Sequence, residues 1–314
     1  MPRTTLLLVR HGARFDYANK EAWKERCAKL GLVAADPPLS SLGHAQARQT
    51  AEALAQEAFS PPISVLLSSP YLRVLQTAQP LAHALNLSIC VEHCLAEFGH
   101  APALIPPPAA RVSLMPEVDE SFTPLIGREC GGVDPATGKE TTVDYFRRLI
   151  AFADALRAGK YRGETIACFS HAASVALIAA LTRCPTLREA GLFAPCGVWV
   201  LVSEDDRTWR VERRGDTNAP HVTSNDPTTF PWGFEHGYKP EAYEKAWQQA
   251  LQMGAADLGR EHSAHSSALS QWLAWLWGPL GRVASPGFAR GVLAGAVLTT
   301  ALAPSLSALR ARIR

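Results

Sequence analysis

Several kinds of segment are absent from this chain of 314 residues, and each absence excludes a class of protein. The seven cysteines include no Cys-x-x-Cys pair, so a zinc site built on paired cysteines is not expected. Residues 1–260 contain no long uncharged apolar run, and the mean hydropathy is -0.02, which excludes a protein with many membrane spans. Charged residues make up only 19% of the chain and apolar residues 47%, which excludes a disordered chain.

The chain also lacks a strong charge of either sign. Its formal net charge is +2, so no nucleic-acid partner is expected. The irregularly spaced cysteines, several of them inside apolar runs, predict reduced thiols in a cytosolic protein. The apolar run near the N-terminus, Leu6–Val9, is too short for a signal peptide and predicts a buried strand. We therefore expect the first domain to be cytosolic.

Short apolar runs alternate with stretches of helical periodicity along the first 240 residues. Strands are predicted at Thr4–Val9, Ile63–Leu67, Leu87–Val91, Glu164–Phe169, Gly197–Val202 and Thr208–Arg213, and helices at Ser40–Glu57, from Pro70 onward, at Thr142–Ala158 and at Ala172–Leu181. This alternation predicts an α/β fold with three α/β/α layers around a mostly parallel sheet. Phe98–Gly138 and Asn218–Pro240 interrupt the pattern, and the first is long enough to be a lid or substrate loop.

The C-terminal part differs from the rest in its charge. We expect a first domain over 1–240, a helical connector over 241–262 and an apolar tail over 263–314, which has five arginines and no Asp, Glu or Lys. Within the tail, Gly291–Leu309 has 19 uncharged residues, enough for one bilayer span, with arginines on both sides and three tryptophans upstream. The tail is therefore a candidate membrane anchor. Its small residues and Pro304 leave open a soluble helix packed on the body.

The strongest chemical signal lies where the first predicted strand ends, at Arg10, His11 and Gly12, with Arg14 close behind. Ligands of open α/β sheets bind at this edge. One arginine guanidinium can bind two phosphate oxygens at once, and a neutral imidazole can attack phosphorus. Glycine lets the backbone turn near a ligand. This combination predicts phosphate chemistry.

Two later segments place similar groups in the same position. Arg73 lies in the first turn of the helix that follows the second strand, and His171 follows the strand Glu164–Phe169. Because parallel strands end at one edge of the sheet, these side chains are expected to meet.

Together these segments resemble the histidine phosphatase superfamily, which has the phosphoglycerate-mutase-like fold. The resemblance covers roughly residues 4–240 and includes the pattern from Asp36 to Gly43. Within the superfamily, Arg10–Asp16 and Val91–Phe98 are most similar to the branch of the suppressor-of-T-cell-receptor-signalling proteins and ecdysteroid-phosphate phosphatases. Asp226-Pro227 with Gly233-Phe234 resembles that branch more weakly.

The resemblance implies a metal-independent phosphatase without a cofactor, acting on phosphomonoesters through a phosphohistidine. It implies the following roles: His11 is the nucleophile, Arg10, Arg14 and Arg73 bind the phosphoryl oxygens, His171 stabilises the transferring group, and Glu97 protonates the leaving group. An acid must hold a proton, so we expect the pKa of Glu97 to be raised by burial or by the phosphate charge. Glu92 is a rival for this role.

Other readings stay open. The family often has Glu or Gln where this chain has Ala13, so contacts at the pocket rim are expected to differ. A phosphoglycerate-type mutase and a non-catalytic, membrane-tethered binding module are the alternatives. Arg111 and Arg128 are expected to be solvated loop residues, and Cys168 a packing residue. The substrate is left among phosphotyrosine proteins, small metabolites and steroid phosphates, and the oligomeric state is not predicted.

Overall fold

The computed structural model describes residues 2–254, except 102–103, 113, 129–133, 135, 217–220, 224–230 and 238. These residues belong to one compact unit that spans Met1–Gly259. Within the ranges just given, no helix has both the length and the apolar character needed to cross a bilayer. The candidate anchor at 291–309 and the Asp226-Pro227 pair lie outside the described residues.

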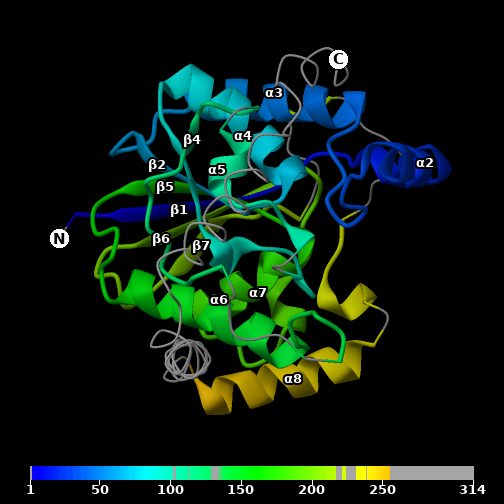
Figure 1. Ribbon diagram of the computed structural model, residues 1–314. Coiled ribbons are helices and arrows are strands. Elements are labelled where there is room, and N and C mark those ends of the chain that lie inside the picture. Colours follow the sequence, from blue (N-terminus) through cyan, green and yellow to red (C-terminus); the bar gives the residue numbers. More distant parts are fainter. Residues whose placement is uncertain are drawn as a thin grey trace, which may run out of the picture. The chain divides into compact units, whose positions relative to one another are not determined.

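A seven-stranded sheet with the order β4-β3-β2-β5-β1-β6-β7 forms the centre of the unit (Figure 1). Its strands are β1 (Thr4–Arg10), β2 (Ile63–Ser68), β3 (Ile89–Val91), β4 (Val118–Asp119), β5 (Thr165–Ser170), β6 (Val198–Ser203) and β7 (Arg210–Arg213). The five strands from β4 to β1 are parallel, whereas β6 pairs antiparallel with β1 and β7 antiparallel with β6. The predicted mostly parallel sheet is confirmed.

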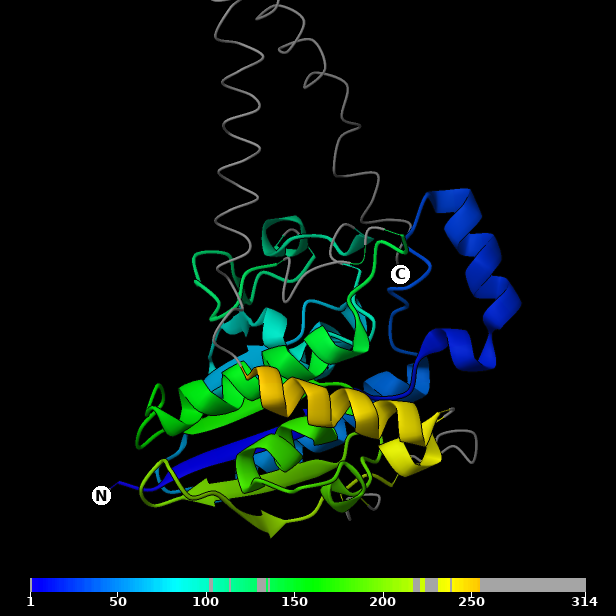
Figure 2. The same cartoon turned by 90° about the horizontal axis from the view of Figure 1, so that it is seen from below.

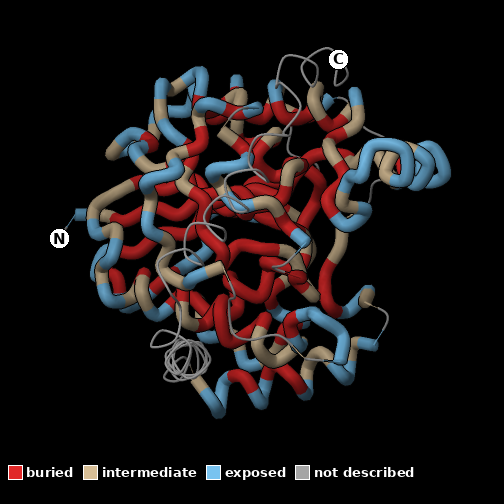
Figure 3. The backbone as a smooth tube through the Cα atoms, viewed as in Figure 1, coloured by how far each residue is buried: buried red, intermediate tan, exposed pale blue. Residues whose placement is uncertain are grey.

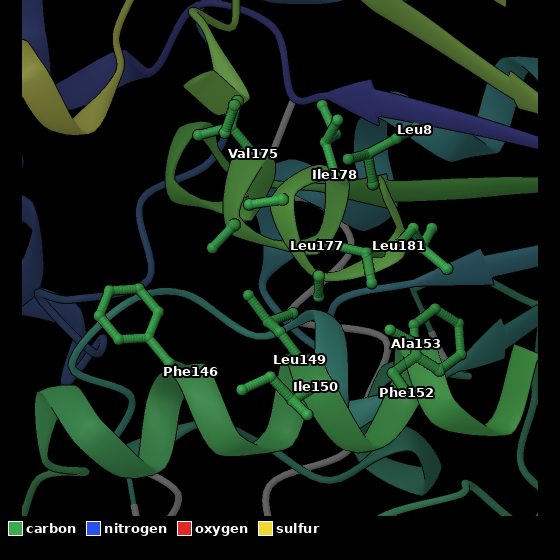
Figure 4. Close-up of a cluster of buried hydrophobic side chains, with 14 of the residues drawn as sticks. Leu8, Phe146, Leu149, Ile150, Phe152, Ala153, Val175, Leu177, Ile178 and Leu181 are labelled. Carbon is green, nitrogen blue, oxygen red and sulfur yellow. The ribbon is translucent and has the colours of Figure 1, made fainter. Parts of the chain in front are cut away.

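Helices cover both faces of this sheet. One face carries α3 (Ser41–Gln56) and α4 (Leu72–Leu85), and the other carries α6 (Thr142–Arg157), α7 (Val175–Thr182) and α8 (Pro240–Met253) (Figure 1). Side chains of β1 alternate between the two cores, because Leu7 and Val9 pack with α4 while Leu6 and Leu8 pack with α6 and α7. Figure 4 shows Leu8 beside α7, above the apolar face of α6. Buried residues accordingly fill the middle of the molecule (Figure 3).

Shorter elements lie around this frame. They are the helices α1 (Phe15–Ala18), α2 (Lys20–Leu30) and α5 (Pro108–Arg111), and single 3-10 turns at His93–Leu95, Ala172–Ser174, Arg188–Ala190 and Phe234–His236. Figure 2 shows α2 standing out from the sheet and its helices. The segment expected to be irregular, 98–138, contributes α5 and the two-residue edge strand β4, which sequence patterns did not predict.

Two helix starts differ from the prediction. The helix expected from Pro70 begins at Leu72, because the carboxylate of Asp36 accepts a hydrogen bond of 2.7 Å from the Leu72 N–H and so satisfies the free helix end. The helix expected from Ala172 opens with a 3-10 turn and becomes α-helical at Val175.

Helix α8 is tied to the sheet domain. Its Trp247 is fully buried and lies edge-to-face with Phe146 of α6 at 5.6 Å between ring centroids. The segment expected as a connector after residue 240 therefore forms part of the same core up to Met253.

Candidate active site

The two histidines leave neighbouring strands side by side. Arg10 of β1 is in register with Ser170 of β5, and the His11 N–H donates to the Ser170 carbonyl at 3.0 Å. His11 and His171 therefore emerge at the same edge, with ring centroids 5.4 Å apart. The sequence-based expectation that these strand ends meet is correct.

Glycines at two distant positions let the chain after His11 pass close to α3. A Cβ on Gly12 would lie 2.7 Å from the Gly43 carbonyl oxygen, and a Cβ on Gly43 would lie 2.2 Å from that of Ala13. The Ala13 N–H donates to the Gln46 side chain at 2.8 Å. Thus the stretch from Asp36 to Gly43 fixes the loop that carries the nucleophile candidate, and Ala13 packs in the interior instead of at a pocket rim.

Hydrogen bonding fixes the tautomer of His11. Its Nδ1 lies 2.7 Å from the Gly12 carbonyl oxygen, which can only accept, so Nδ1 carries the proton. Burial, with the positive charges of Arg73 and Arg10 nearby, holds the pKa of His11 well below 6.5. The ring is therefore neutral at pH 7, with its lone pair on Nε2.

Arg73 joins the other predicted groups. Its Nη2 lies 2.9 Å from Oε2 of Glu97 and 3.2 Å from Nδ1 of His171, while the other side of the His171 ring bonds Ser69 Oγ at 2.8 Å. The Arg73 side chain is buried, and within the described part of the chain its Nε and Nη1 have no hydrogen-bond partner. Buried guanidinium N–H groups without partners are what a bound anion would satisfy.

The charge of Glu97 differs from what the sequence suggested. Burial raises its pKa, but His171 and Arg73 outweigh burial and bring the pKa well below 4.5. Burial lowers the pKa of His171 to about 4, against the opposing effect of the Glu97 carboxylate. We take His171 as neutral, with the proton on Nδ1, which lies 3.1 Å from Oε2 of Glu97, and with Nε2 accepting from the Ser69 hydroxyl. The expected rise of the Glu97 pKa by burial is wrong, because the two neighbouring groups outweigh burial.

A cleft lies beside the histidine pair, and Arg10 at the end of β1 and Arg14 in the loop after it both line this cleft. Arg10 donates to the Phe193 carbonyl at 2.5 Å, and burial lowers its pKa to about 10, so it stays charged at pH 7. Arg14 makes two hydrogen bonds to the Asp16 carboxylate, at 2.9 Å and 2.7 Å, and its guanidinium stacks over Tyr17. All three predicted arginines are thus near the histidine pair. The positive charge of Arg14 is balanced by the Asp16 carboxylate.

The rival acid Glu92 is used elsewhere. Its two carboxylate oxygens accept from the N–H groups of Cys94 at 3.3 Å and Leu125 at 2.7 Å. Burial raises its pKa, which is the property expected of an acid, yet it does not line the cleft. Glu92 fastens the 98–138 segment to the turn after β3.

Sequence reasoning missed the polar residues that hold the site in place. These are Ser69 beside His171, Tyr71 whose ring lies 5.1 Å from that of His171, and the buried pair Arg148–Glu140 behind Glu97. Ser69 and Tyr71 sit next to Arg73 in the sequence and could have been singled out for that reason. Nothing in the sequence around Arg148 or Glu140 connects them with Glu97.

The structure also shows the contacts of the two loop arginines and the location of the cysteine that the sequence analysis named. Arg111, expected to be solvated, is buried and forms an ion pair with Asp36, while Arg128 donates to the Ile105 carbonyl. Cys168 is fully buried in the core, as predicted.

A cleft of about 610 Å³ opens beside these groups. Its lining residues are Arg10, Arg14, Tyr17, Glu97, Phe98, Ala172, Ala173, Trp232, Phe234 and Tyr243. The volume is suited to a small molecule.

His11, Glu97 and His171 could also be considered as metal ligands, because one ligand atom of each lies within 4.8 Å of the others. Sequence spacing gave no hint of this cluster, since its members come from three strand ends. The donor set fits a cation poorly, because the Arg73 guanidinium already contacts both Glu97 Oε2 and His171 Nδ1.

A family model for the histidine phosphatase superfamily (branch 1) matches residues 6–217. The chain belongs to this superfamily. The fold is similar to that of the ecdysone phosphate phosphatase of Bombyx mori in complex with tungstate, with 21% identity and a TM-score of 0.51 over 69% of this chain and 94% of that one.

Further solved structures are more distant. A mycobacterial glucosyl-3-phosphoglycerate phosphatase complexed with VO3 has 22% identity and a TM-score of 0.45, over 69% of this chain and 100% of that one. A phosphoglycerate mutase from Bacillus anthracis has 20% identity and a TM-score of 0.47, over 71% of this chain and 96% of that one. No curated protein matches the chain.

Proposed function

We propose that this histidine phosphatase superfamily member hydrolyses phosphate monoesters through a phosphohistidine formed on Nε2 of His11. The observation that carries the proposal is the His11 tautomer. Its proton is held on Nδ1 by the Gly12 carbonyl, so the lone pair of Nε2 is available for attack. Burial keeps the ring neutral, and the Arg73 N–H groups without partners lie in the same cluster.

In the first step Nε2 of His11 forms a bond to phosphorus while the ester P–O bond breaks. The oxygen of the leaving alcohol takes a proton from Glu97. Arg10 and Arg73 bind the equatorial oxygens, whose negative charge they balance in the transition state. His171, which can gain a proton once a phosphoryl dianion lies against it, adds a further donor.

In the second step Glu97, now a carboxylate, takes a proton from water. The water oxygen bonds to phosphorus, the P–Nε2 bond breaks, and inorganic phosphate leaves. Glu97 ends protonated and His11 neutral. As inorganic phosphate leaves, Glu97 releases to solvent the proton that it took up when the substrate bound, and the cycle closes.

The low pKa of Glu97 sets a condition on this mechanism. Arg73 now stabilises the carboxylate at 2.9 Å. A phosphoryl dianion would share that guanidinium and add negative charge nearby, and both effects raise the pKa of Glu97. In this proposal the substrate itself brings Glu97 into its protonated form.

Rapid-quench labelling tests the proposal. With p-nitrophenyl phosphate carrying labelled phosphorus, we expect acid-labile, alkali-stable label on the wild-type chain and none on His11→Ala. Label that survives hot acid would point to a phosphoserine or phosphotyrosine and contradict the proposal.

Assays of the wild-type chain distinguish a phosphatase from a mutase and from a non-catalytic binding module. Release of inorganic phosphate from p-nitrophenyl phosphate, without isomerisation of 3-phosphoglycerate, supports a phosphatase over a mutase. A non-catalytic binding module would act on neither. The presence of His11, Arg10, Arg73 and His171 in one cluster favours catalysis.

A further inference from the structure

Aromatic rings form half of the lining of the active-site cleft. Five of its ten lining residues are aromatic: Tyr17, Phe98, Trp232, Phe234 and Tyr243. The charged residues of the lining are Arg10, Arg14 and Glu97, and the proposed reaction uses Arg10 and Glu97.

Four of these rings form one continuous wall, which we call the aromatic wall: Trp232, Phe234, Tyr243 and Phe98. Successive rings meet edge-to-face, with centroids 5.1 Å apart for Trp232–Phe234, 5.5 Å for Phe234–Tyr243 and 5.6 Å for Tyr243–Phe98. Such contacts hold rings in fixed orientations, so the wall is preformed. Phe234 is also anchored in the core through Phe146.

Three members of the wall lie beyond residues 6–217, the part of the chain that matches the family model. Trp232 and Phe234 belong to the segment before α8, and Tyr243 to the first turns of α8, which packs on α6 through Trp247. The catalytic groups thus come from the matched region, whereas most of the wall comes from residues that follow it.

We infer that the alcohol part of the substrate is an aromatic or fused-ring apolar group that packs on the aromatic wall. This inference rests on the phosphatase function proposed above. A sugar or polyol would gain less, because it presents less apolar surface to the wall, whose polar atoms are limited to the Tyr243 hydroxyl and the Trp232 indole N–H. An apolar ring would instead gain from leaving water.

The test compares two phosphates of unactivated primary alcohols, benzyl phosphate and glycerol 3-phosphate. Their leaving groups are alike in basicity, so the ratio of their kcat/KM values reports recognition of the alcohol part. We expect benzyl phosphate to be favoured by about 10- to 100-fold, the range for burial of one ring. A ratio near one, or one that favours glycerol 3-phosphate, overturns the inference.

Variants of the wall locate the effect. Tyr243→Ala should lower the ratio of the two kcat/KM values by about 5- to 10-fold, whereas Tyr243→Phe should keep it. If the alanine variant folds poorly, Trp232→Leu tests the wall at a second position and should also lower the ratio. Tyr161→Ala is the matched control, because Tyr161 is a half-buried aromatic residue that does not line the cleft. An unchanged ratio in both wall variants overturns the inference.

Binding separates this inference from the proposed reaction. Calorimetry with the His11→Ala variant measures affinity for the same two esters without turnover. Tighter binding of benzyl phosphate supports the wall even if no phosphohistidine forms, whereas equal affinities overturn it even if hydrolysis is observed. Comparing phenyl phosphate with a phosphotyrosine peptide then shows whether the ring belongs to a small molecule or to a polypeptide.

Discussion

Arg148 of α6 donates two hydrogen bonds to the Glu140 carboxylate, at 2.6 Å and 3.0 Å, in a pair that is fully buried. The same guanidinium donates to the carbonyls of Ala96 at 2.9 Å and Glu97 at 3.0 Å. The Glu140 N–H donates to the His100 carbonyl at 2.8 Å, which closes the base of the 98–138 segment. The pair therefore fixes the backbone that presents Glu97.

We expect Arg148→Lys to damage both stability and the acid step. Lysine keeps the charge but cannot make the forked contacts, and breaking a buried pair typically costs about 3–5 kcal/mol. In folded protein, turnover of alkyl phosphates should fall more than that of p-nitrophenyl phosphate, because the position of Glu97 is loosened. Urea unfolding and steady-state kinetics measure the two effects.

The neighbouring residue provides a control for this variant. Arg147 is also buried on α6, but it bonds Asp144 and the Gly254 carbonyl, away from Glu97. Arg147→Lys should destabilise the fold without changing the preference between the two kinds of ester. Equal loss on both esters in Arg148→Lys would show that Arg148 does not act through Glu97.

Glu97→Gln tests the proton donor itself. An alkyl leaving group needs a proton in the transition state, whereas p-nitrophenolate leaves readily, so we expect losses of about 100-fold and less than about 10-fold respectively. Single-turnover rates with benzyl and p-nitrophenyl phosphate give the comparison. Glu92→Gln tests the rival acid. If this variant, and not Glu97→Gln, loses more rate on benzyl phosphate than on p-nitrophenyl phosphate, Glu92 is the proton donor.

The main parts of the site were predictable because they depend on local pattern and on sheet topology. Apolar runs such as Leu6–Val9 indicate strands buried on both faces, and parallel strands end at one edge, so the meeting of His11 and His171 follows. The helix predicted to start at Ser40 is also present, and the Ser40 side chain caps it by accepting from the Gly43 N–H.

Side-chain contacts that do not follow from the sheet topology were not predictable. The ionisation of Glu97 depends on a distance to Arg73 that only the folded chain sets, so reasoning from burial alone gave the wrong direction. The two-residue strand β4 is too short to show alternation. The aromatic wall joins Phe98 to Tyr243 across most of the domain, and α8 gave no signal beyond helical periodicity.

The pH dependence should reflect the low pKa of His11. For a histidine with an ordinary pKa of about 6.5, the neutral fraction would fall about fivefold between pH 6.5 and 5.5. Here the folded pKa lies well below 6.5, so kcat/KM for p-nitrophenyl phosphate, corrected for substrate ionisation, should show no such loss in that window. Lowering the pH protonates His11 only well below pH 6.5.

Arg73→Gln provides the matching variant. Removing this cation should raise the pKa of His11, though burial keeps it under 6.5. An NMR titration of the His11 ring protons measures the change directly. A His11 pKa near 6.5 in the wild type would contradict both the burial argument and the expected profile.

Activity should not require a divalent metal. Any cation between His11, Glu97 and His171 would have to displace Arg73 and lie beside its charge. We expect EDTA dialysis to leave turnover unchanged, and vanadate to inhibit because it imitates five-coordinate phosphorus. Loss of activity on dialysis with recovery on adding Mg²⁺ or Zn²⁺ would show a metal enzyme.

The C-terminal sequence makes a separate prediction, namely that Gly291–Leu309 anchors the chain to an intracellular membrane with the phosphatase domain facing the cytosol. Its 19 uncharged residues match the length of one span, but Arg310, Arg312 and Arg314 would have to lie at the far interface, which is costly. A helix lying in the membrane surface avoids this cost.

Fractionation of cells that express the full chain distinguishes these arrangements. Pelleting that resists carbonate indicates a span, release by carbonate indicates a surface helix, and a full chain that stays in the supernatant without detergent excludes both. A chain ending at Arg260 should be released in every case. Leu298→Arg places a charge near the centre of the 19 residues at a cost of about 2.5–3.5 kcal/mol, so it should convert a carbonate-resistant protein into a released one. A full chain that pellets equally with and without this substitution would show that the 19 residues do not cross the bilayer.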